Sequence, residues 1–394
     1  MKISCFLKDF FLIFLLILIL PYINSCSDEA NSQEDSHRIY ISTDIASGLV
    51  GGWRSGPADN DDGFAVELMS SFANTVIEGV AVLRGNDIQP AELFAADQIF
   101  VQNPGVWNGP IIPGAIEFLP TPDPVMWTGG KEGDVTLTDI CVNDAVVSLS
   151  NLLSESSQPI TILALGPLTD IACLVLNFPG TLSNIKEIVF LGGRLPDEVL
   201  KFSFSDIIFT DFNIAQDVRA TQVVLNDSNI PITFISFSLS SSATYTRAQI
   251  DSLQDEGCSD RAKTLSRGAQ AGMDVFQSDF NLDGLDTFDI NAAYYIAKPE
   301  LFICEDAGFE FVECEIGTPG VANGDNNSCA SHGPDQSSGL NSEFEQLWVG
   351  PALLGQSRTV RTCTSYINQQ ELDRFESGTI DVICTGQEWT DLPL

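Results

Sequence analysis

The sequence predicts an α/β fold: an open, mostly parallel, twisted sheet with helices on both faces, in a single domain. Two observations predict it. Short apolar runs rich in β-branched residues alternate with segments of helical period along most of the chain. Runs such as 159–165 (PITILAL) are apolar without interruption, which is typical of parallel strands buried on both faces. Such sheets bind ligands beyond the carboxyl ends of their strands, so chemically active residues are expected there.

The strands are predicted from these apolar runs and from the residues that end them. RIYIST (38–43) ends at Asp44, and IKEIVFL (185–191) ends at Gly192 and Gly193. In chain order, strands are expected at 38–43, 76–83, 159–165, 185–191, 230–236, 309–314, 357–364 and 379–384.

The helices are predicted where apolar residues recur every three or four positions. Phe64, Leu68 and Phe72, for example, share one face of a helix at 62–72. In chain order, helices are expected at 62–72, 91–101, 141–153, from Pro167 onward, and at 214–225, 247–253, 261–276, 290–297 and 368–375. The stretch rich in Gly, Ser, Asn and Asp at about 318–342 is expected to be a surface insertion.

The amino-terminal segment 1–26 has the pattern of a signal peptide, with basic residues before an apolar run at 10–20. Cys26 follows in a context that resembles a bacterial lipobox, which predicts a lipid anchor at Cys26. An ordinary signal peptide with an incidental cysteine is the alternative. Residues 27–36 are expected to be an acidic tether and 37–394 the folded domain. We therefore expect an exported protein, either a cell-envelope lipoprotein (periplasmic or cell surface) or a secreted one.

The net charge limits the classes of partner that are expected, and the cysteine content bears on disulfide formation after export. The formal net charge of −36 disfavours a nucleic acid polymer as a partner, because an acidic surface repels phosphates. Export permits disulfides, and the five cysteines between 304 and 384 predict one or two bridges in the C-terminal quarter. The only histidines are His37 and His332, which argues against a histidine-based metal site or a Ser-His-Asp triad.

Acidic and amide residues follow the predicted strands. They are Asp44, Asp61, Asp62, Asn86, Asp211, Asn213 and Asp289, together with a turn at Leu165 that can point its main-chain carbonyl inward. Taken singly, each acid or amide is typical of a helix cap. Taken together at one sheet edge, they indicate a site for calcium or magnesium, because converging carboxylates repel one another unless a cation joins them.

Six segments, in this order, resemble the inosine-uridine-preferring nucleoside hydrolase family. They are Ser42-Thr43-Asp44 with Asp61-Asp62 after a long insertion, GVAVLRGN (79–86), ALGPLTDIA (164–172), IVFLGG (188–193), DFNIAQDVRA (211–220) and FDINAAYYIAKPELF (288–302). The resemblance spans about 39–382. It implies a nucleoside hydrolase-like domain that cleaves the N-glycosidic bond of ribonucleosides to ribose and free base.

The resemblance also implies the site. One calcium ion (Ca2+) would hold the ribose diol and the attacking water, with Asp44, Asp62, Asp289 and the main-chain carbonyl of Leu165 as its ligands. Asp44 would also be the catalytic base that accepts the proton of the water. The substrate-binding residues would be Asp61, Asn86, Asp211 and Asn213 at the ribose hydroxyls and Phe288 at the base.

The first part of the family signature is altered. Ser42 replaces its first acid, which is a supporting position rather than a ligand. The insertion at 45–60 is long enough to act as a lid, and its Asp59 leaves the choice of acids open by one or two positions.

Phe288 stands where many members of the family have a histidine that protonates the leaving base. Phenylalanine cannot donate a proton, but Phe288 with Trp53, Trp107 or Trp127 would stack on the base. Stacking favours purine nucleosides and a role in purine salvage. Packing in the core is the alternative for each of these rings.

Other functions stay open from the sequence. A non-catalytic nucleoside- or sugar-binding lipoprotein of the same fold is favoured by Phe288 and the altered first loop, and opposed by the retained acids. Hydrolysis of a different N-riboside is a third function, and a homo-oligomer is compatible with each. The loop at 279–290 has EF-hand-like spacing but ends in Ile290 instead of glutamate, which favours a solvated acidic turn over a separate calcium site.

Overall fold

The computed structural model describes residues 37–49, 60–120, 136–196, 198, 200, 211–280, 284–315, 343–387 and 389. His37–Leu394 form one compact unit. The predicted signal peptide, lipid anchor and tether lie outside the described residues, as do Trp53, Trp127, most of the predicted lid and the insertion at 318–342. Residues 281–283 of the EF-hand-like loop also lie outside the described residues. None of the helices within the described ranges is long and apolar enough to cross a membrane.

A nine-stranded sheet forms the centre of the fold, in the order β10-β9-β11-β6-β5-β4-β1-β2-β3. Neighbouring strands are parallel from β3 to β11, and β9 is antiparallel to both β11 and β10. The strands are β1 (His37–Thr43), β2 (Thr75–Val82), β3 (Ile111–Pro113), β4 (Ile160–Ala164), β5 (Ile185–Leu191), β6 (Ile232–Ile235), β9 (Phe302–Glu315), β10 (Glu343–Gly350) and β11 (Val360–Tyr366). A separate small sheet pairs β7 (Thr244–Tyr245) with β8 (Leu285–Asp286).

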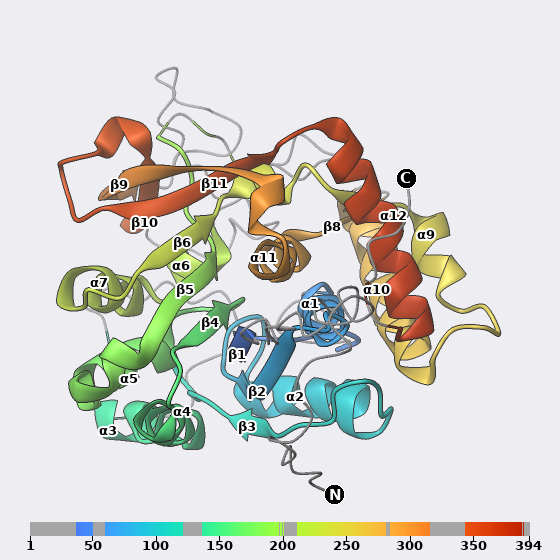
Figure 1. Ribbon diagram of the computed structural model, residues 1–394, viewed down its shortest axis with the longest axis horizontal. Coiled ribbons are helices and arrows are strands. Elements are labelled where there is room, and N and C mark those ends of the chain that lie inside the picture. Colours follow the sequence, from blue (N-terminus) through green and yellow to red (C-terminus); the bar gives the residue numbers. More distant parts are fainter. Residues whose placement is uncertain are drawn as a thin grey trace, which may run out of the picture. The chain divides into compact units, whose positions relative to one another are not determined.

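Helices cover both faces of the sheet, as predicted (Figure 1). They are α1 (Asp62–Ser70), α2 (Gln89–Ala96), α3 (Leu137–Cys141), α4 (Asp144–Glu155), α5 (Thr169–Asn177), α6 (Phe212–Gln216), α7 (Val218–Asp227), α8 (Phe237–Ser240), α9 (Arg247–Ser252), α10 (Asp260–Phe280), α11 (Phe288–Ala297) and α12 (Gln369–Thr385). The π-helical turn η1 (Asp97–Val101) extends α2, and the 3-10 turns are η2 (Pro179–Asn184), η3 (Pro299–Leu301) and η5 (Pro351–Leu353). The open, mostly parallel α/β fold is therefore confirmed.

The alternation of side chains along β1 shows how one strand serves two cores. Ile39 and Ile41 join the core beneath α1, α10, α11 and α12, whereas Tyr40 joins the core beneath α3, α4, α5 and α7. β1 is paired with β2 on one side and β4 on the other, with Thr43 opposite Val82 and Ser42 opposite Ala164. The residues that follow these three strands consequently meet at one edge of the sheet.

The last predicted strand, 379–384, is wrong. These residues belong to α12, which begins after the capping residue Asn368 and ends at Gly386. Their β-branched side chains suggested a strand, but Phe375, Thr379 and Ile383 recur at helical spacing and are buried. Packing of one helical face thus overrides a local preference for strand.

Several other elements differ from the prediction in extent. β9 begins at Phe302 rather than at 309, and the helix expected at 141–153 is α4, preceded by the separate α3. The helix expected from Pro167 begins at Thr169, and the helix expected at 214–225 is divided into α6 and α7 at Asp217. β10 was not predicted. It pairs with the second half of β9, and its Val349 N–H donates to the carbonyl of Arg194 after β5 at 2.8 Å.

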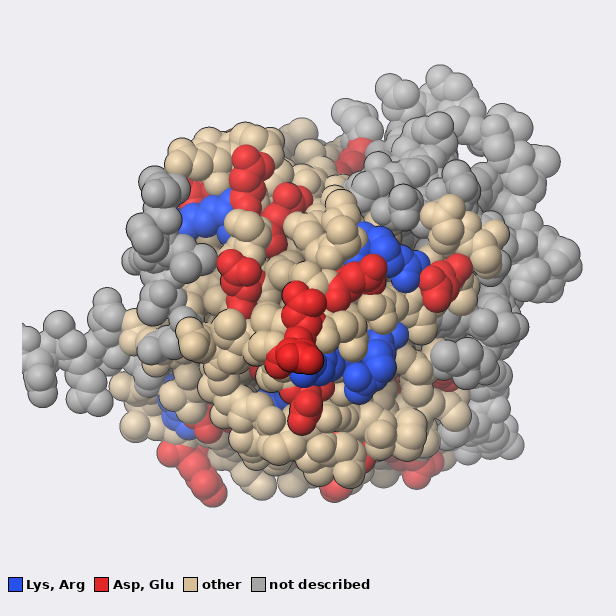
Figure 2. Space-filling view, turned by 90° about the vertical axis from the view of Figure 1, so that its right-hand side faces the viewer, with Lys and Arg blue, Asp and Glu red and all other residues tan. Residues whose placement is uncertain are grey.

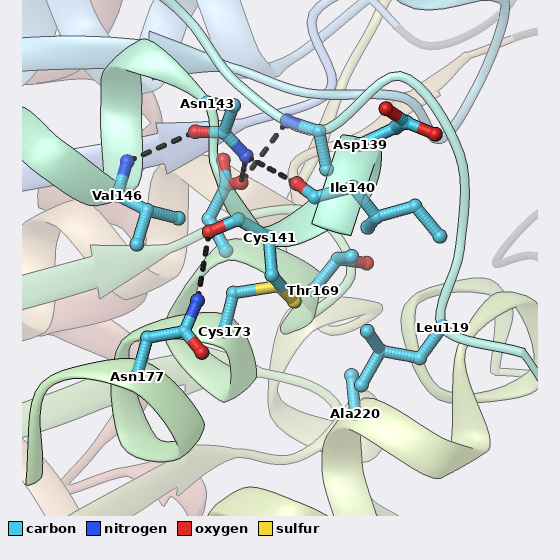
Figure 3. The surroundings of a disulfide bond; sticks show 12 residues. Leu119, Asp139, Ile140, Cys141, Asn143, Val146, Thr169, Cys173, Asn177 and Ala220 are labelled. Atoms are coloured by element: carbon cyan, nitrogen blue, oxygen red, sulfur yellow. Dashed lines mark hydrogen bonds between the residues drawn. A yellow bond between two sulfur atoms is a disulfide. The ribbon is translucent and has the colours of Figure 1, made fainter. Parts of the chain in front are cut away.

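Three disulfides join elements that are distant in sequence. Cys304–Cys363 links β9 to β11 within the C-terminal quarter, as predicted, and Cys258–Cys384 ties α12 to the segment before α10. Cys141–Cys173 was not predicted and joins α3 to α5. Figure 3 shows this bridge beside Asn177, whose side-chain amide donates to the carbonyl of Cys141 at 3.0 Å.

Acidic side chains are spread over the face that carries α9, α10 and α12. Figure 2 shows them interspersed with Lys and Arg on this face. The formal charge of −36 is therefore not carried here by a single acidic patch.

Candidate active site

Asp44 lies directly after β1 and is 1% exposed. Its carboxylate is enclosed by the turns that follow β2 and β4. A Cβ atom added at Gly166 would lie 2.6 Å from Asp44 Oδ1, and one added at Gly85 would collide with Oδ2. Only glycine permits the main chain of both turns to approach the Asp44 carboxylate so closely.

Asn86 lies beside Asp44, as the strand-end argument predicted. Its side-chain nitrogen donates to the main-chain carbonyl of Asp44 at 3.3 Å. Asn86 is half-buried, so it lines the edge of the sheet.

Asp61 and Asp289 are brought together although 228 positions separate them in the sequence. Asp61 Oδ2 accepts a hydrogen bond from the main-chain N–H of Asp289 at 2.8 Å. Asp61 precedes α1, Asp289 lies in the first turn of α11, and both are buried. The contact joins the first and the last segments of the family pattern.

Asp62 opens α1 and is fully buried. Its Oδ1 accepts a hydrogen bond from the hydroxyl of Thr43, the residue before Asp44. Asp62 is therefore held against the carboxyl end of β1, next to the predicted catalytic base.

Leu165 and Asn213 also meet at this edge. The side-chain nitrogen of Asn213 donates to the carbonyl of Leu165 at 2.6 Å and to the carbonyl of Leu191 at 3.1 Å. Asn213 thus ties together the ends of β4 and β5.

Asp211 is turned toward main-chain N–H groups. It accepts from Gly193 at 2.7 Å and, as the N-cap of α6, from Ile214 at 3.2 Å. Burial raises the pKa of Asp211 to about 6, although these N–H donors and the nearby Arg194 act in the opposite direction. Asp211 is therefore a helix cap, the alternative that was open from the sequence. Its contact with a ribose hydroxyl stays a prediction.

Phe288 belongs to an aromatic cluster at the same edge. Its ring centroid is 4.8 Å from that of Phe237, and Phe212 and Leu200 complete the cluster. Phe288 and Phe212 are only partly buried. Phe237 follows β6 and was missed, although the strand-end rule would have found it.

Trp107 lies elsewhere, so the expectation that it stacks on the base is wrong. Its indole N–H donates to the carbonyl of Ile77 at 3.2 Å, near the amino end of β2, and its ring packs edge-on against Phe100. Asn86 follows the opposite end of the same strand. Trp107 instead packs against the core, which was the alternative stated for its ring.

Glu92 is a fully buried acid that no motif predicted. Its Oε1 accepts from the N–H groups of Gly85 and Asp87, at 3.2 Å and 2.6 Å. Burial, together with the charge of nearby Asp44, raises the pKa of Glu92 well above its usual range. Glu92 therefore lies beneath the turn that carries Asn86.

The oxygen donors at this edge are of the chemical type that a hard cation prefers. Asp44, Asp62 and Asp289 are buried carboxylates, and the glycine turns approach the Asp44 oxygens closely. Calcium prefers carboxylate and carbonyl oxygens, and burying several like charges without a cation is costly. Across the described ranges, no three His, Cys, Asp or Glu side chains converge closely enough to hold a metal by themselves. The calcium ligands stay a prediction.

Comparison with known proteins identifies the family. The model of the family "Inosine-uridine preferring nucleoside hydrolase" matches residues 57–386. The chain belongs to this family. The match begins after Asp44 and includes Asp61, Asp62 and Asp289.

Two curated relatives are similar to this chain over part of their length. The non-specific ribonucleoside hydrolase RihC of Salmonella schwarzengrund is 28% identical over 159 residues, which is 40% of this chain and 47% of RihC. An uncharacterized protein of Schizosaccharomyces pombe is 25% identical over 185 residues, 45% of this chain and 54% of that protein. The chain thus spans about half the length of the curated relatives it matches.

A solved structure of a nucleoside hydrolase shares the fold over nearly its whole length. The purine-preferring ribonucleoside hydrolase from Gardnerella vaginalis superposes with a TM-score of 0.60 at 15% identity, covering 88% of this chain and 99% of that one. At this identity the likeness concerns the fold alone.

Proposed function

We propose that the protein hydrolyses the N-glycosidic bond of ribonucleosides, releasing ribose and free base. The observation that carries the proposal is the place of Asp44, whose carboxylate is buried between the glycine turns after β2 and β4. Asn86 contacts Asp44 itself, Asp62 contacts the preceding Thr43, and the N–H of Leu165 donates to the carbonyl of Ser42 at 2.8 Å. Membership of the nucleoside hydrolase family supports the same activity.

The sugar would be held by the polar groups at this edge. Breaking the N-glycosidic bond builds positive charge on the ribose ring, and nearby carboxylates stabilise that charge. Asp61, Asp211, Asn86 and Asn213 are proposed to bind the hydroxyls. A site built to bond these hydroxyls discriminates against sugars that lack them, because its buried polar groups would then be left unpaired.

Asp44 is proposed to accept the proton of the attacking water at one carboxylate oxygen. The glycine turns restrain the carboxylate, so it is positioned before substrate arrives. Asp62, Asp289 and the carbonyl of Leu165, with Asp44, are the groups that would hold calcium. When bound, the ion would supply charge compensation and would lower the pKa of a bound water, so that a carboxylate would suffice as base at neutral pH.

The base is proposed to stack against Phe288. The cluster of Phe288, Phe237 and Phe212 offers aromatic surface beside the site but no proton donor. Stacking suits the larger purine ring, and a structural relative is described as purine-preferring. We therefore propose purine ribonucleosides as the preferred substrates.

The test compares inosine, adenosine and uridine as substrates in the presence of calcium, with released reducing sugar as the readout. Asp44→Asn keeps the shape of the side chain but removes the base, so we expect kcat to fall by about 10³-fold. The matched control is Asp139→Asn at an exposed carboxylate in the first turn of α3, which should leave kcat unchanged. Chelation should abolish activity, and added calcium should restore it.

A non-catalytic binding protein remains the alternative because Phe288 replaces a family proton donor. Tight nucleoside binding without release of ribose would establish that alternative. Equal activity of Asp44→Asn and the wild type would overturn the role of Asp44.

A further inference from the structure

We propose that Glu92 is a positioning residue for the hydrolytic site. It fixes the Gly85–Asp87 turn so that Asn86 and Asp44 meet the substrate in a defined geometry. One oxygen of Glu92, Oε1, accepts the main-chain N–H groups of both Gly85 and Asp87, the residues on either side of Asn86. The inference rests on the proposed function and adds a residue that the family pattern did not predict.

The turn is a sensitive place for such a restraint. The turn passes so close to the Asp44 carboxylate that a Cβ atom added at Gly85 would collide with it, so a small shift of the turn changes the room available to that group. Asn86 donates to the main-chain carbonyl of Asp44 at 3.3 Å, so the same shift also moves an amide proposed to bind ribose. A misplacement of about 1 Å near reacting groups can lower the rate by about 100-fold.

Stability alone does not account for a glutamate at this position. Glu92 is fully buried, and its second oxygen, Oε2, has no hydrogen-bond partner among the residues that the structure describes. A buried carboxyl group with one unpaired oxygen costs free energy of folding, whereas its other oxygen satisfies two N–H groups at the site. The residue is therefore best explained by what it holds in place.

Two substitutions separate the hydrogen bonds from the volume of the side chain. Glu92→Gln keeps an acceptor oxygen for the two N–H groups and should retain most of the activity. Glu92→Met keeps a similar volume but removes the acceptor, so kcat/KM for inosine should fall by about 100-fold. Hydrogen–deuterium exchange should become faster in the peptide spanning 83–92 of Glu92→Met but not of Glu92→Gln.

The matched control is Arg358→Met at the opposite end of the sheet. Arg358 also makes two hydrogen bonds to main-chain groups, the carbonyls of Leu225 and Ile230, both at 2.8 Å. Arg358→Met should lower the unfolding temperature while kcat/KM and the exchange of 83–92 stay as in the wild type. This separates positioning from a general loss of stability.

A double-mutant cycle tests whether Glu92 acts through the turn. In an Asn86→Ala background, Glu92→Met should lower kcat/KM much less than it does in the wild type, because part of what it positions is already absent. If the fold-loss in kcat/KM of the double variant equals the product of the two single fold-losses, the proposal is overturned. A Glu92→Met enzyme with unchanged kcat/KM and unchanged hydrogen–deuterium exchange would also overturn it.

Failure of the proposed function is distinguishable from failure of this inference. If the wild type releases no ribose, the hydrolase assignment fails. The positioning role of Glu92 is then tested by hydrogen–deuterium exchange and by calorimetric measurement of inosine binding. Faster exchange at 83–92 with weaker binding in Glu92→Met would then support positioning. No change in either would overturn it.

Discussion

The side-chain amide of Asn213 bonds the main-chain carbonyl of Leu165 at 2.6 Å and that of Leu191 at 3.1 Å. A carboxamide has two N–H donors, so both are used within the protein. If Asn213 also contacts a ribose hydroxyl, as predicted, its Oδ1 atom must accept that hydrogen bond. The same residue also restrains the carbonyl of Leu165, which is a predicted calcium ligand.

Asn213→Ala should accordingly impair both catalysis and stability. Removing both donors frees the carbonyls at the ends of β4 and β5, at a cost of about 1–3 kcal/mol in the free energy of unfolding. We expect kcat/KM for inosine to fall by about 100-fold, measured by steady-state kinetics. Asn184→Ala removes a similar bond to the carbonyl of Leu153 (2.7 Å) far from the site, and should lower stability without changing kcat/KM. Equal kinetic losses in the two variants would refute the role of Asn213.

Phe288→Leu should reduce the preference for purines. The substitution keeps an apolar side chain but removes the ring that faces Phe237, and aromatic pairs contribute about 0.5–1.5 kcal/mol beyond their buried area. The ratio of kcat/KM for inosine to that for uridine should fall several-fold. Phe309→Leu in β9, where Phe309 packs against Phe311, is the control and should leave this ratio unchanged. A ratio insensitive to Phe288 would show that the ring does not contact the base.

Stability should decrease as pH rises from about 4 to about 6 through the buried acid Asp217. Burial raises the pKa of Asp217 from 3.8 to about 6, even though Leu119, Thr169 and Ala220 donate hydrogen bonds to it. Because the folded state holds the proton more tightly, this contribution is complete below pH ~3.8 and is lost as pH rises through ~6. Thermal unfolding of Asp217→Asn should show a smaller decrease than the wild type, by about 1.4 kcal/mol per pH unit within this window.

The control for this pH effect is Asp139→Asn. Asp139 is exposed, and its hydrogen bonds with Thr136 lower its pKa, so its removal cannot reduce a loss of stability between pH ~4 and ~6. Parallel pH curves for the wild type and Asp217→Asn would contradict the raised pKa.

Loss of the Cys258–Cys384 disulfide should destabilise the protein strongly. The bridge spans 126 positions, and closing a loop of this length in the unfolded chain is worth about 5 kcal/mol in the entropic model. The double variant Cys258→Ser/Cys384→Ser should therefore unfold at a lower temperature than the wild type. Its activity at low temperature should be retained, because neither cysteine contacts the proposed site. An unchanged unfolding temperature would contradict the loop-closure argument.

The central sheet and the gathering of Asp44, Asn86 and Leu165 could be predicted because both follow from local pattern. Uninterrupted apolar runs indicate buried parallel strands, and the ends of such strands meet at one edge. The contact between Asp61 and Asp289 needed the family resemblance, since spacing along the chain does not show which helices pack together.

Other features could not be predicted for physical reasons. The helix over 379–384 depends on burying one face in the core that it shares with α1, α10 and α11, which outweighs the strand preference of Ile380 and Ile383. Glu92 has an ordinary helical sequence context, and its importance arises only when the turn before α2 folds back over it. Phe237, by contrast, follows a predicted strand and could have been found by the rule already applied to Asp44.

The hydrogen bond from Asp289 to Asp61 has a consequence for synthesis of the protein. The ribosome must extend the chain beyond residue 289 before this contact can form. Shorter nascent chains lack the Asp289 partner of Asp61, however well their first strands have paired. The proposed activity would then appear late, as a property of the nearly finished polypeptide rather than of an early folding unit.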